Sequence, residues 1–330
     1  MAHAPNPRSS RIVTRSCTSK AAVRPWSDLP PELLSPIADR LGLIELLGFR
    51  GSCKSWQSAS STATAEIESS PDQNPWFILY GEDSKCILYS ESAKKKYTIN
   101  IPELDGATCL ASSHGWLLLY CKQSIFFFCP FSRAKIELPE FPHSDLSNHV
   151  GVFSAPPTSE NCVVCVINRQ DDRIVELNML CRGAEAWTKD EHVCAFDCLE
   201  NISSATYHEG NFYFLDNANK MLTYSVNKKK WTRYRIIENR KDTSPDADYL
   251  PFGYKRSYFR NCCLKNCLDL EDNVSVSTCG TTIPGHDWAV VLNNEKIEAE
   301  KENETRQLKG VWIHPRFLQV PPNLSWAKPK

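Results

Sequence analysis

Short apolar runs separated by turns recur along most of this 330-residue chain, and they constrain its fold more than any other feature. Each run has the length of a β-strand and is rich in aromatic and β-branched residues. The runs are Trp76–Tyr80, Cys86–Tyr89, Tyr97–Ile99, Trp116–Tyr120, Ile125–Phe128, Lys135–Pro139, Val163–Ile167, Ile174–Leu177, Phe212–Leu215, Met221–Tyr224 and Trp231–Tyr234. The pattern predicts an all-β region after residue 74.

The runs form a repeat. With Leu79, Leu117, Val163 and Tyr213 as equivalent centres, the steps are 38, 46 and 50 residues. Periods of about 40–50 residues with several strands each are typical of propeller blades. Because a blade buries its faces only against its neighbours, such an array must close on itself. The region has room for about five or six blades of this period. A β-sandwich-like arrangement remains open.

Two repeat units share a local sequence before their second strand. His114-Gly115 and Glu209-Gly210 occupy this position, and glycine permits the positive φ of a tight turn. Trp187 and Trp231 resemble the closing aromatic residue of a kelch-type blade, although the double glycine of a true kelch repeat is absent.

Residues 26–67 show a helical pattern instead. Ser27 or Asp28 can cap a first helix, and Pro31 suits its first turn, where a missing N–H costs nothing. Gly42 is expected to end this helix.

Apolar residues of this helical segment repeat along one helical face. Leu33, Ile37 and Leu41 recur at intervals of four residues. Two further short helices are expected, one from Leu43, Leu46, Leu47 and Phe49, and one from Arg50, Cys53, Lys54 and Trp56. Three helices in about 40 residues bury little area alone, so their Leu, Ile and Trp side chains imply a partner or a covering domain.

The residue order of this segment resembles an F-box. It runs Leu29-Pro30-Pro31-Glu32-Leu33-Leu34, Ile37, Arg40-Leu41 and Glu45-Leu46-Leu47, and closes on Arg50-Gly51-Ser52-Cys53-Lys54-Ser55-Trp56. F-box proteins bind a SKP-family adaptor, which links them to a cullin scaffold and a ubiquitin-conjugating enzyme. The resemblance implies residues that contact the adaptor or support the contact: Leu29, Pro30, Leu33, Ile37, Leu41, Leu46, Leu47 and Trp56. Gly51 and Ser52 stand where other members often have bulkier residues, which would weaken adaptor binding without abolishing it.

The remainder resembles the kelch-like F-box-associated domain of plant F-box proteins. The resemblance rests on Ser112-Ser113-His114-Gly115-Trp116-Leu117-Leu118-Leu119, on Asn273–Thr282 and on Gly310–Phe317. Together with the F-box it covers nearly all of residues 26–326. It implies a propeller-like receptor for a protein substrate, with no cofactor and no catalysis of its own.

The chain is therefore expected to be an α+β multidomain protein, with a small three-helix F-box followed by an all-β, β-propeller-like domain. The expected parts are a flexible basic tail (1–25), the F-box helical module (26–67), a linker (68–74), the substrate-recognition domain (75–326) and a short tail (327–330). The first tail is rich in Arg and Ser and has no acidic residue before Asp28, so an organelle transit peptide and a nuclear import signal remain alternatives.

Composition excludes several classes of function. The net charge of −1 argues against a nucleic-acid binder that works by global charge. No transmembrane helix is expected, because no apolar run approaches 18 residues, and no secretory signal is expected before Asp28. The 15 cysteines cannot all pair within one chain, and most lie in apolar runs, which favours core thiols in a reducing compartment. The expected location is the nucleus, the cytoplasm or both.

No catalytic, cofactor or metal site is predicted. Cys162 and Cys165 have the spacing of a metal or redox pair, but strand residues three apart point to opposite faces. Cys262, Cys263 and Cys267 have no histidine nearby. His114 has no local nucleophile with a supporting carboxylate. No phosphate-binding loop or Rossmann glycine pattern occurs.

Two lysine triplets occupy equivalent turns between strands. Lys94–Lys96 and Lys228–Lys230 could form one basic rim on a propeller face or simply be exposed turn residues.

The favoured function is the substrate-recognition subunit of an SCF-type (SKP–cullin–F-box) E3 ubiquitin ligase. Its partners would be the SKP-family adaptor, through it a cullin scaffold, and an unidentified protein substrate. The alternatives are an F-box-like interaction protein outside any ligase, an organellar β-propeller protein with a cleaved transit peptide, and an enzyme with a propeller active site.

Overall fold

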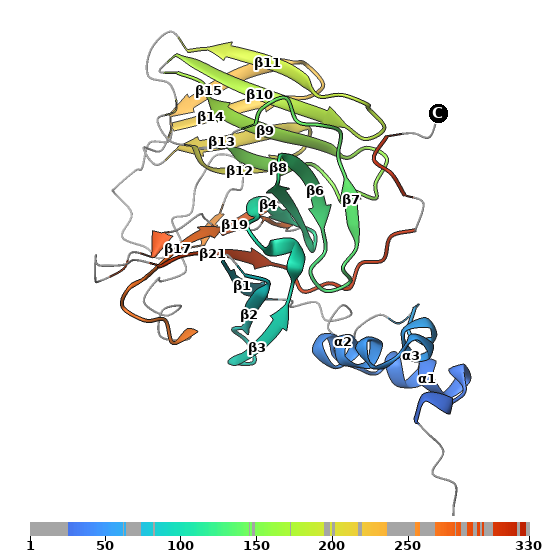
Figure 1. Cartoon of the computed structure of the whole chain (residues 1–330). Helices are drawn as coiled ribbons and strands as arrows, with labels where there is room; N and C mark the ends of the chain where they lie inside the picture. The colour runs from blue at the N-terminus through green and yellow to red at the C-terminus, as the bar shows by residue number, and fades with distance from the viewer. Residues whose placement is uncertain are drawn as a thin grey trace, which may run out of the picture.

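The computed structural model describes residues 26–61, 63, 74–81, 83–144, 146, 149–171, 173–194, 199, 202–216, 220–235, 255–257, 268–280, 282–284, 289–292, 296–297, 299, 306–321 and 324–327. Three short helices precede a domain built from several β-sheets, as expected (Figure 1). The basic tail and most of the expected linker lie outside the described residues.

The N-terminal module contains a 3-10 turn and three helices: η1 (Trp26–Asp28), α1 (Pro31–Ala38), α2 (Leu43–Ser52) and α3 (Lys54–Ala59). Pro31 stands in the first turn of α1, as predicted, but the predicted cap was wrong. Pro30 is the N-cap residue, and no side chain bonds there, because Ser27 and Asp28 belong to the separate turn η1.

Two boundaries between these helices also differ from the expectation. The first helix ends at Ala38, with Asp39 as its C-cap, and Gly42 instead precedes the second helix as its N-cap. Arg50 belongs to α2, because the backbone is extended at Cys53 and separates it from α3.

The β domain contains a 3-10 turn, η3 (Pro102–Leu104), and four sheets among the described residues. The strands of the first half are β1 (Trp76–Tyr80), β2 (Lys85–Ser90), β3 (Lys95–Asn100), β4 (Thr108–Ser113), β5 (Trp116–Cys121), β6 (Ser124–Phe128), β7 (Lys135–Glu137), β8 (Val150–Phe153), β9 (Val163–Arg169) and β10 (Ile174–Cys181). Those of the second half are β11 (Thr188–Val193), β12 (Ile202–His208), β13 (Asn211–Asp216), β14 (Lys220–Ser225), β15 (Lys230–Arg235), β16 (Lys255–Ser257), β17 (Val274–Cys279), β18 (Thr282–Pro284), β19 (Ala289–Leu292), β20 (Lys296–Ile297) and β21 (Arg306–Ile313).

Four antiparallel blades are clear in this order. Blade 2 is β4-β5-β6-β7, blade 3 is β8-β9-β10-β11 and blade 4 is β12-β13-β14-β15. Blade 1 combines β1, β2 and β3 with the last strand that the structure describes, β21, which pairs antiparallel with β1. The first and last parts of the domain are thus joined within one sheet.

The repeat centres chosen from the sequence are structurally equivalent. Leu79, Leu117, Val163 and Tyr213 lie in β1, β5, β9 and β13, and each of these is the second strand of its blade when β21 is counted as the first strand of blade 1. The fifth or sixth expected blade falls on residues 236–305, most of which lie outside the described residues. The described strands there, β16–β20, extend the sheets of blades 1 and 2.

The inner strands are neighbours around the domain. β21 lies beside β4, β4 beside β8, β8 beside β12, and β12 beside β19. In both β4 and β12 the pairing register shifts by one residue, between Cys109 and Ala111 and between Ile202 and Ser204. A bulge of this kind increases local strand twist, which helps sheets to pack around a common axis.

The turns that follow β4 and β12 adopt the conformation predicted from their glycines. His114 and Gly115 have φ of 54° and 80°, and Glu209 and Gly210 have φ of 45° and 81°. Two successive positive φ angles define the type I′ turn that joins two twisted antiparallel strands most tightly.

Tryptophans at the outer strands link each blade to the preceding one. The Trp187 indole, just before β11, donates to the carbonyl of Pro139 at 3.0 Å. The Trp231 indole in β15 donates to the carboxylate of Asp190 in β11 at 2.9 Å. The position predicted for the closing aromatic residue of a blade is therefore used to join blades.

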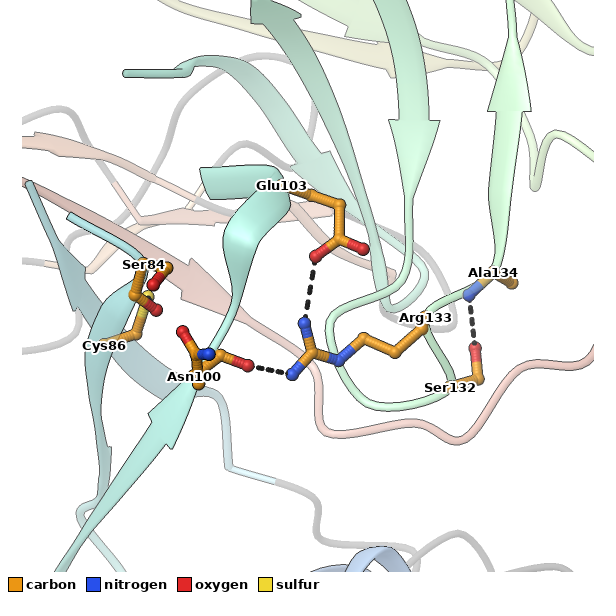
Figure 2. A network of polar contacts seen from close by, with 7 residues as sticks. All are labelled: Ser84, Cys86, Asn100, Glu103, Ser132, Arg133 and Ala134. Carbon is orange, nitrogen blue, oxygen red and sulfur yellow. Dashed lines mark hydrogen bonds and ion pairs between the residues drawn. The ribbon is translucent and has the colours of Figure 1, made fainter. Parts of the chain in front are cut away.

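An arginine makes the corresponding link between blades 1 and 2. Figure 2 shows Arg133 reaching from the β6–β7 turn to η3 and to the end of β3. Its guanidinium contacts the Glu103 carboxylate at 2.9 Å and donates to the carbonyl of Asn100. Both charged side chains are about one-third exposed, so the pair contributes at most about 1 kcal/mol and mainly fixes geometry.

Candidate functional site

The outward face of the N-terminal helices carries large apolar side chains. Among the described residues, only five large hydrophobic side chains are exposed: Trp26, Leu33, Ile37, Val193 and Tyr234. Three of the five lie within the twelve residues from Trp26 to Ile37, with exposed fractions of 76%, 56% and 45%. Exposed Pro30 lies on the same short segment. A concentration of this kind marks an interaction surface.

The opposite face of the same helices is packed. Leu34 and Ala38 of α1 and Leu46 of α2 are fully buried. Leu43 and Phe49 of α2 are almost fully buried. Ser35 holds α1 against α3, because its hydroxyl donates to the carbonyl of Ala59 at 2.7 Å. The outward side chains are therefore carried on a fixed backbone.

A tryptophan fixes the start of the segment. The Trp56 indole of α3 donates to the carbonyl of Trp26 at 3.2 Å and packs on Phe49 with ring centroids 4.5 Å apart. Through this bond η1 is tied to the third helix, and the side chain of Trp26 stays on the surface.

The eight residues that the F-box resemblance implies fall into three groups. Pro30, Leu33 and Ile37 face outward. Leu29, Leu41, Leu47 and Trp56 are half-buried and pack against the core. Leu46 is fully buried, so it can support an interface but cannot contact a partner.

Sequence reasoning left Trp26 out of the site. It lies in η1 before the first helix, so the four-residue apolar spacing that marks Leu33 and Ile37 does not include it. Its signal was a large apolar side chain three positions before the Leu29-Pro30 start of the motif.

The cysteine pair in blade 3 belongs to the core. Cys162 and Cys165 are both fully buried, and they pack in two different hydrophobic clusters, as expected for residues on opposite faces. Burial raises the pKa of the Cys162 thiol to about 12 and keeps it protonated. Cys262, Cys263 and Cys267 lie outside the described residues.

His114 occupies a turn, and its ring Nδ1 lies 2.8 Å from the hydroxyl of Ser113. Burial and the charge of Arg316 lower its pKa, so the ring is neutral near pH 7. Within the described part of the chain, no group of three or more His, Cys, Asp or Glu side chains could hold a metal ion. No described helix is long and apolar enough to span a membrane.

The two lysine triplets lie in equivalent hairpins. Lys94 and Lys229 each end the turn before the outer strand of their blade, β3 or β15, and both have positive φ, 52° and 47°. They lie on blades 1 and 4. Within the described residues, no ion pair of the triplet at Lys228–Lys230 is found, whereas Lys96 pairs with Asp269. A common basic rim stays a prediction.

Comparison with known families agrees with both parts of the architecture. A model described as "F-box domain" matches residues 26–63, and one described as "KIB1-4 beta-propeller" matches residues 88–281, which is more than half of the chain.

The curated relatives are F-box proteins. The F-box/kelch-repeat protein At1g57790 of Arabidopsis thaliana is 29% identical over 72% of this chain and 67% of its own length. The F-box protein At4g00893 of the same plant is 27% identical over 65% of this chain and 55% of its length. The chain thus spans 67% and 55% of the lengths of these two relatives.

Among solved structures, the WD40 domain of SCAP from fission yeast is 12% identical, with a TM-score of 0.28 over 51% of this chain and 43% of that chain, too low to support a conclusion. The two family matches and the curated relatives, in contrast, are sufficient to assign the chain to a family. It belongs to the plant F-box proteins that carry a KIB1-4 β-propeller domain.

Proposed function

We propose that this protein is the substrate-recognition subunit of an SCF-type ubiquitin ligase. The observation that carries the proposal is the outward apolar face of η1 and α1, made of Trp26, Leu33 and Ile37. This face would dock on the SKP-family adaptor, and the β domain would hold a protein substrate.

The energetics of such docking are favourable. Burying an apolar side chain such as Leu or Ile contributes about 1.5–3 kcal/mol, and large aromatic anchors dominate most interfaces. The backbone under these side chains is already fixed by the Ser35 and Trp56 hydrogen bonds, so little ordering entropy is lost on binding.

The protein would not catalyse the reaction itself. Its contribution is proximity: a substrate held on the β domain has its lysines near a charged conjugating enzyme, and the local concentration of the reacting groups rises. The ubiquitin transfer then occurs on the partner enzymes.

The test is binding of the full chain to a purified SKP-family adaptor, by calorimetry. A Leu33→Asp/Ile37→Asp variant changes two outward side chains that the helix core does not need. We expect its affinity to fall at least about 100-fold, which corresponds to about 2.7 kcal/mol. The control is Val193→Asp, which places one such charge on an exposed apolar site of β11 and should leave affinity unchanged.

Absence of binding by a folded parent chain would refute the ligase proposal. Binding of the adaptor without recruitment of a cullin scaffold would favour an F-box-like interaction protein outside any ligase.

We further propose that the chain acts in the nucleus, the cytoplasm or both. The proposal is supported by the partners of the F-box family. Imaging of a C-terminally tagged chain tests it, and import into an organelle with loss of the first 25 residues would contradict it.

A further inference from the structure

The segment after β21 packs against both parts of the molecule. Residues 314–321 and 324–327, here called the C-terminal strap, form neither helix nor strand apart from one isolated bridge, between Gly183 and Ala327. Figure 1 shows the first half of the strap, in red, on the side of the β domain nearest to the helices, and the second half along the edge of the domain beyond β7. Side-chain contacts, rather than sheet pairing, hold it in place.

The first half of the strap contacts the N-terminal helices. The guanidinium of Arg50, in α2, lies 4.4 Å from the centre of the Phe317 ring. The same guanidinium donates to the carbonyl of Ser60 at 2.8 Å. The side-chain amide of Gln319 donates to the carbonyl of Ser61. Arg50 therefore joins the end of α2, the end of α3 and the strap.

Phe317 also belongs to a hydrophobic cluster shared by the helices and the blades. It is 5% exposed and belongs to a continuous cluster that includes Leu34 and Leu46 of the helices and Trp76 and Phe128 of blades 1 and 2. One apolar cluster thus contains side chains of the helices, the strap and the blades.

The strap is anchored on blade 2 close to these contacts. The thiol of Cys129 donates to the carbonyl of Arg316 at 3.4 Å. A Cβ added to Gly115 would lie 2.8 Å from the Cβ of Arg316. The strap therefore lies directly against the β4–β5 turn, and this turn leaves space only for glycine.

A second anchor lies at the far end. Trp326 is 2% exposed and stacks on Phe127 of β6 with ring centroids 5.7 Å apart. Its indole donates to the carbonyl of Cys181 at 3.1 Å, and its own carbonyl accepts from the N–H of Gly183 at 3.1 Å. The guanidinium of Arg182 lies 5.1 Å from its ring centre.

We infer that the C-terminal strap is a strut that fixes the orientation of the F-box helices on the β-propeller. Two anchors on blades 2 and 3 hold its ends. Between these anchors, Phe317 contacts Arg50 of α2 and Gln319 donates to the carbonyl of Ser61, just after α3. The inference rests on the proposed function only for its biological consequence, that the substrate is presented at a constant distance from the conjugating enzyme. A simpler alternative is that the strap only seals blades 2 and 3, in which case the helices would reorient freely.

The experiment is ¹⁵N relaxation on the deuterated full chain, comparing amides of α1–α3 with amides of blades 3 and 4. In the parent we expect one rotational correlation time for both groups. In a Phe317→Ala/Gln319→Ala variant, the helices should tumble independently, with a correlation time about twofold shorter than that of the blades, since weakly joined domains move by default. Equal correlation times in this variant would overturn the inference.

Controls separate loss of the strut from loss of stability. Gln307→Ala removes an exposed glutamine of β21 outside the strap, and Phe214→Ala removes a fully buried ring between blades 3 and 4. Neither should uncouple the helices. If the Phe317→Ala/Gln319→Ala variant does not fold, Phe317→Leu/Gln319→Ala keeps an apolar side chain at position 317. It loses the contact of Arg50 with the ring and the hydrogen bond to the Ser61 carbonyl, and the same difference in correlation time is expected.

The relaxation measurement needs no adaptor, so it distinguishes failure of the strut from failure of the proposed function. Adaptor affinity should stay within about threefold in the strap variant, because the outward face is untouched. Trp326→Ala gives an independent check. Loss of the far anchor should also shorten the correlation time of the helices. If the strap detaches and the correlation time of the helices does not change, the inference is contradicted.

Discussion

The β domain buries most of its large aromatic side chains, Tyr234 being an exception, whereas the N-terminal helices leave Trp26, Leu33 and Ile37 outward. In the blades, Trp116, Phe127 and Phe128 are almost completely buried and support the packing of neighbouring strands. The comparison separates residues that stabilise the chain from residues that are available to a partner. Substitutions that affect stability and binding differently test this separation.

The largest expected effect is on stability. Phe128→Ala removes a fully buried ring from β6 and should lower the free energy of unfolding by about 3–5 kcal/mol. Leu33→Ala, in an outward position, should change it by no more than about 0.5 kcal/mol. Urea unfolding of both variants measures the difference. Comparable losses would mean that α1 uses its outward face for its own folding.

Glycine substitutions should have opposite signs in the two regions. In β21, a Cβ on Gly310 would lie 2.2 Å from Cζ of Phe77, so Gly310→Ala should cost about 1–3 kcal/mol. In α2, nothing lies within 4 Å of a Cβ on Gly48, so Gly48→Ala should stabilise the chain by about 0.5–1 kcal/mol. Thermal unfolding of the two variants checks the signs, and a destabilised Gly48→Ala would contradict the open surface.

A buried carboxylate should make blade 3 sensitive to acid. Glu176 is 1% exposed, and although burial raises its pKa, hydrogen bonds from Lys189, Asn178 and His143 outweigh burial and hold the pKa below its ordinary value. Its stabilising contribution is therefore present above about pH 4.5 and is lost as the pH falls through the folded-state pKa.

Glu176→Gln should cost about 1–3 kcal/mol at pH 7, with the difference from the parent shrinking below pH 4.5. Unfolding curves at several pH values measure this. A difference that does not change with pH would show that packing, not charge, is responsible. The exposed pair of Lys135 and Glu137 is the control, and Glu137→Gln should have little effect at any pH.

The smallest effect concerns backbone conformation. Among the described residues, every residue other than glycine that has a positive φ lies in the β domain. Lys229 is one of them. Lys229→Gly should stabilise the β14–β15 hairpin by about 0.5 kcal/mol, because glycine adopts this conformation without steric cost. Differential scanning calorimetry can detect the shift. A lower melting temperature would mean that the lysine side chain contributes a contact.

The middle strands of the blades could be predicted from the sequence, and the inner strands β4, β8 and β12 could not. β1, β5, β6 and β13 are continuous apolar runs, because both faces of each are buried between blades. The inner strands β4 and β12 are rich in Ser, Thr or Ala and are interrupted by bulges. The inner strand β8 has only four residues, one of them a glycine, so neither composition nor alternation marks these strands.

The candidate site was predictable through a motif rather than through periodicity. The spacing of Leu33 and Ile37 indicates one helical face but not whether that face is buried or exposed. In the structure, the next residue after each of the two, Leu34 and Ala38, is buried instead. These two side chains belong to the same buried cluster as Phe49 of α2. Only tertiary packing decides between the two faces, and only the F-box resemblance indicated the outcome.

The pairing of β21 with β1 also has a consequence for synthesis of the chain. β1 emerges from the ribosome early, but its partner strand β21 begins only at Arg306. Until then, the edge of Trp76–Tyr80 has no partner on that side, and an unpaired apolar edge invites aggregation. A chain truncated before residue 306 would therefore lack the β1–β21 pairing, and such a product should be recognised by cellular quality control even if blades 2, 3 and 4 are intact.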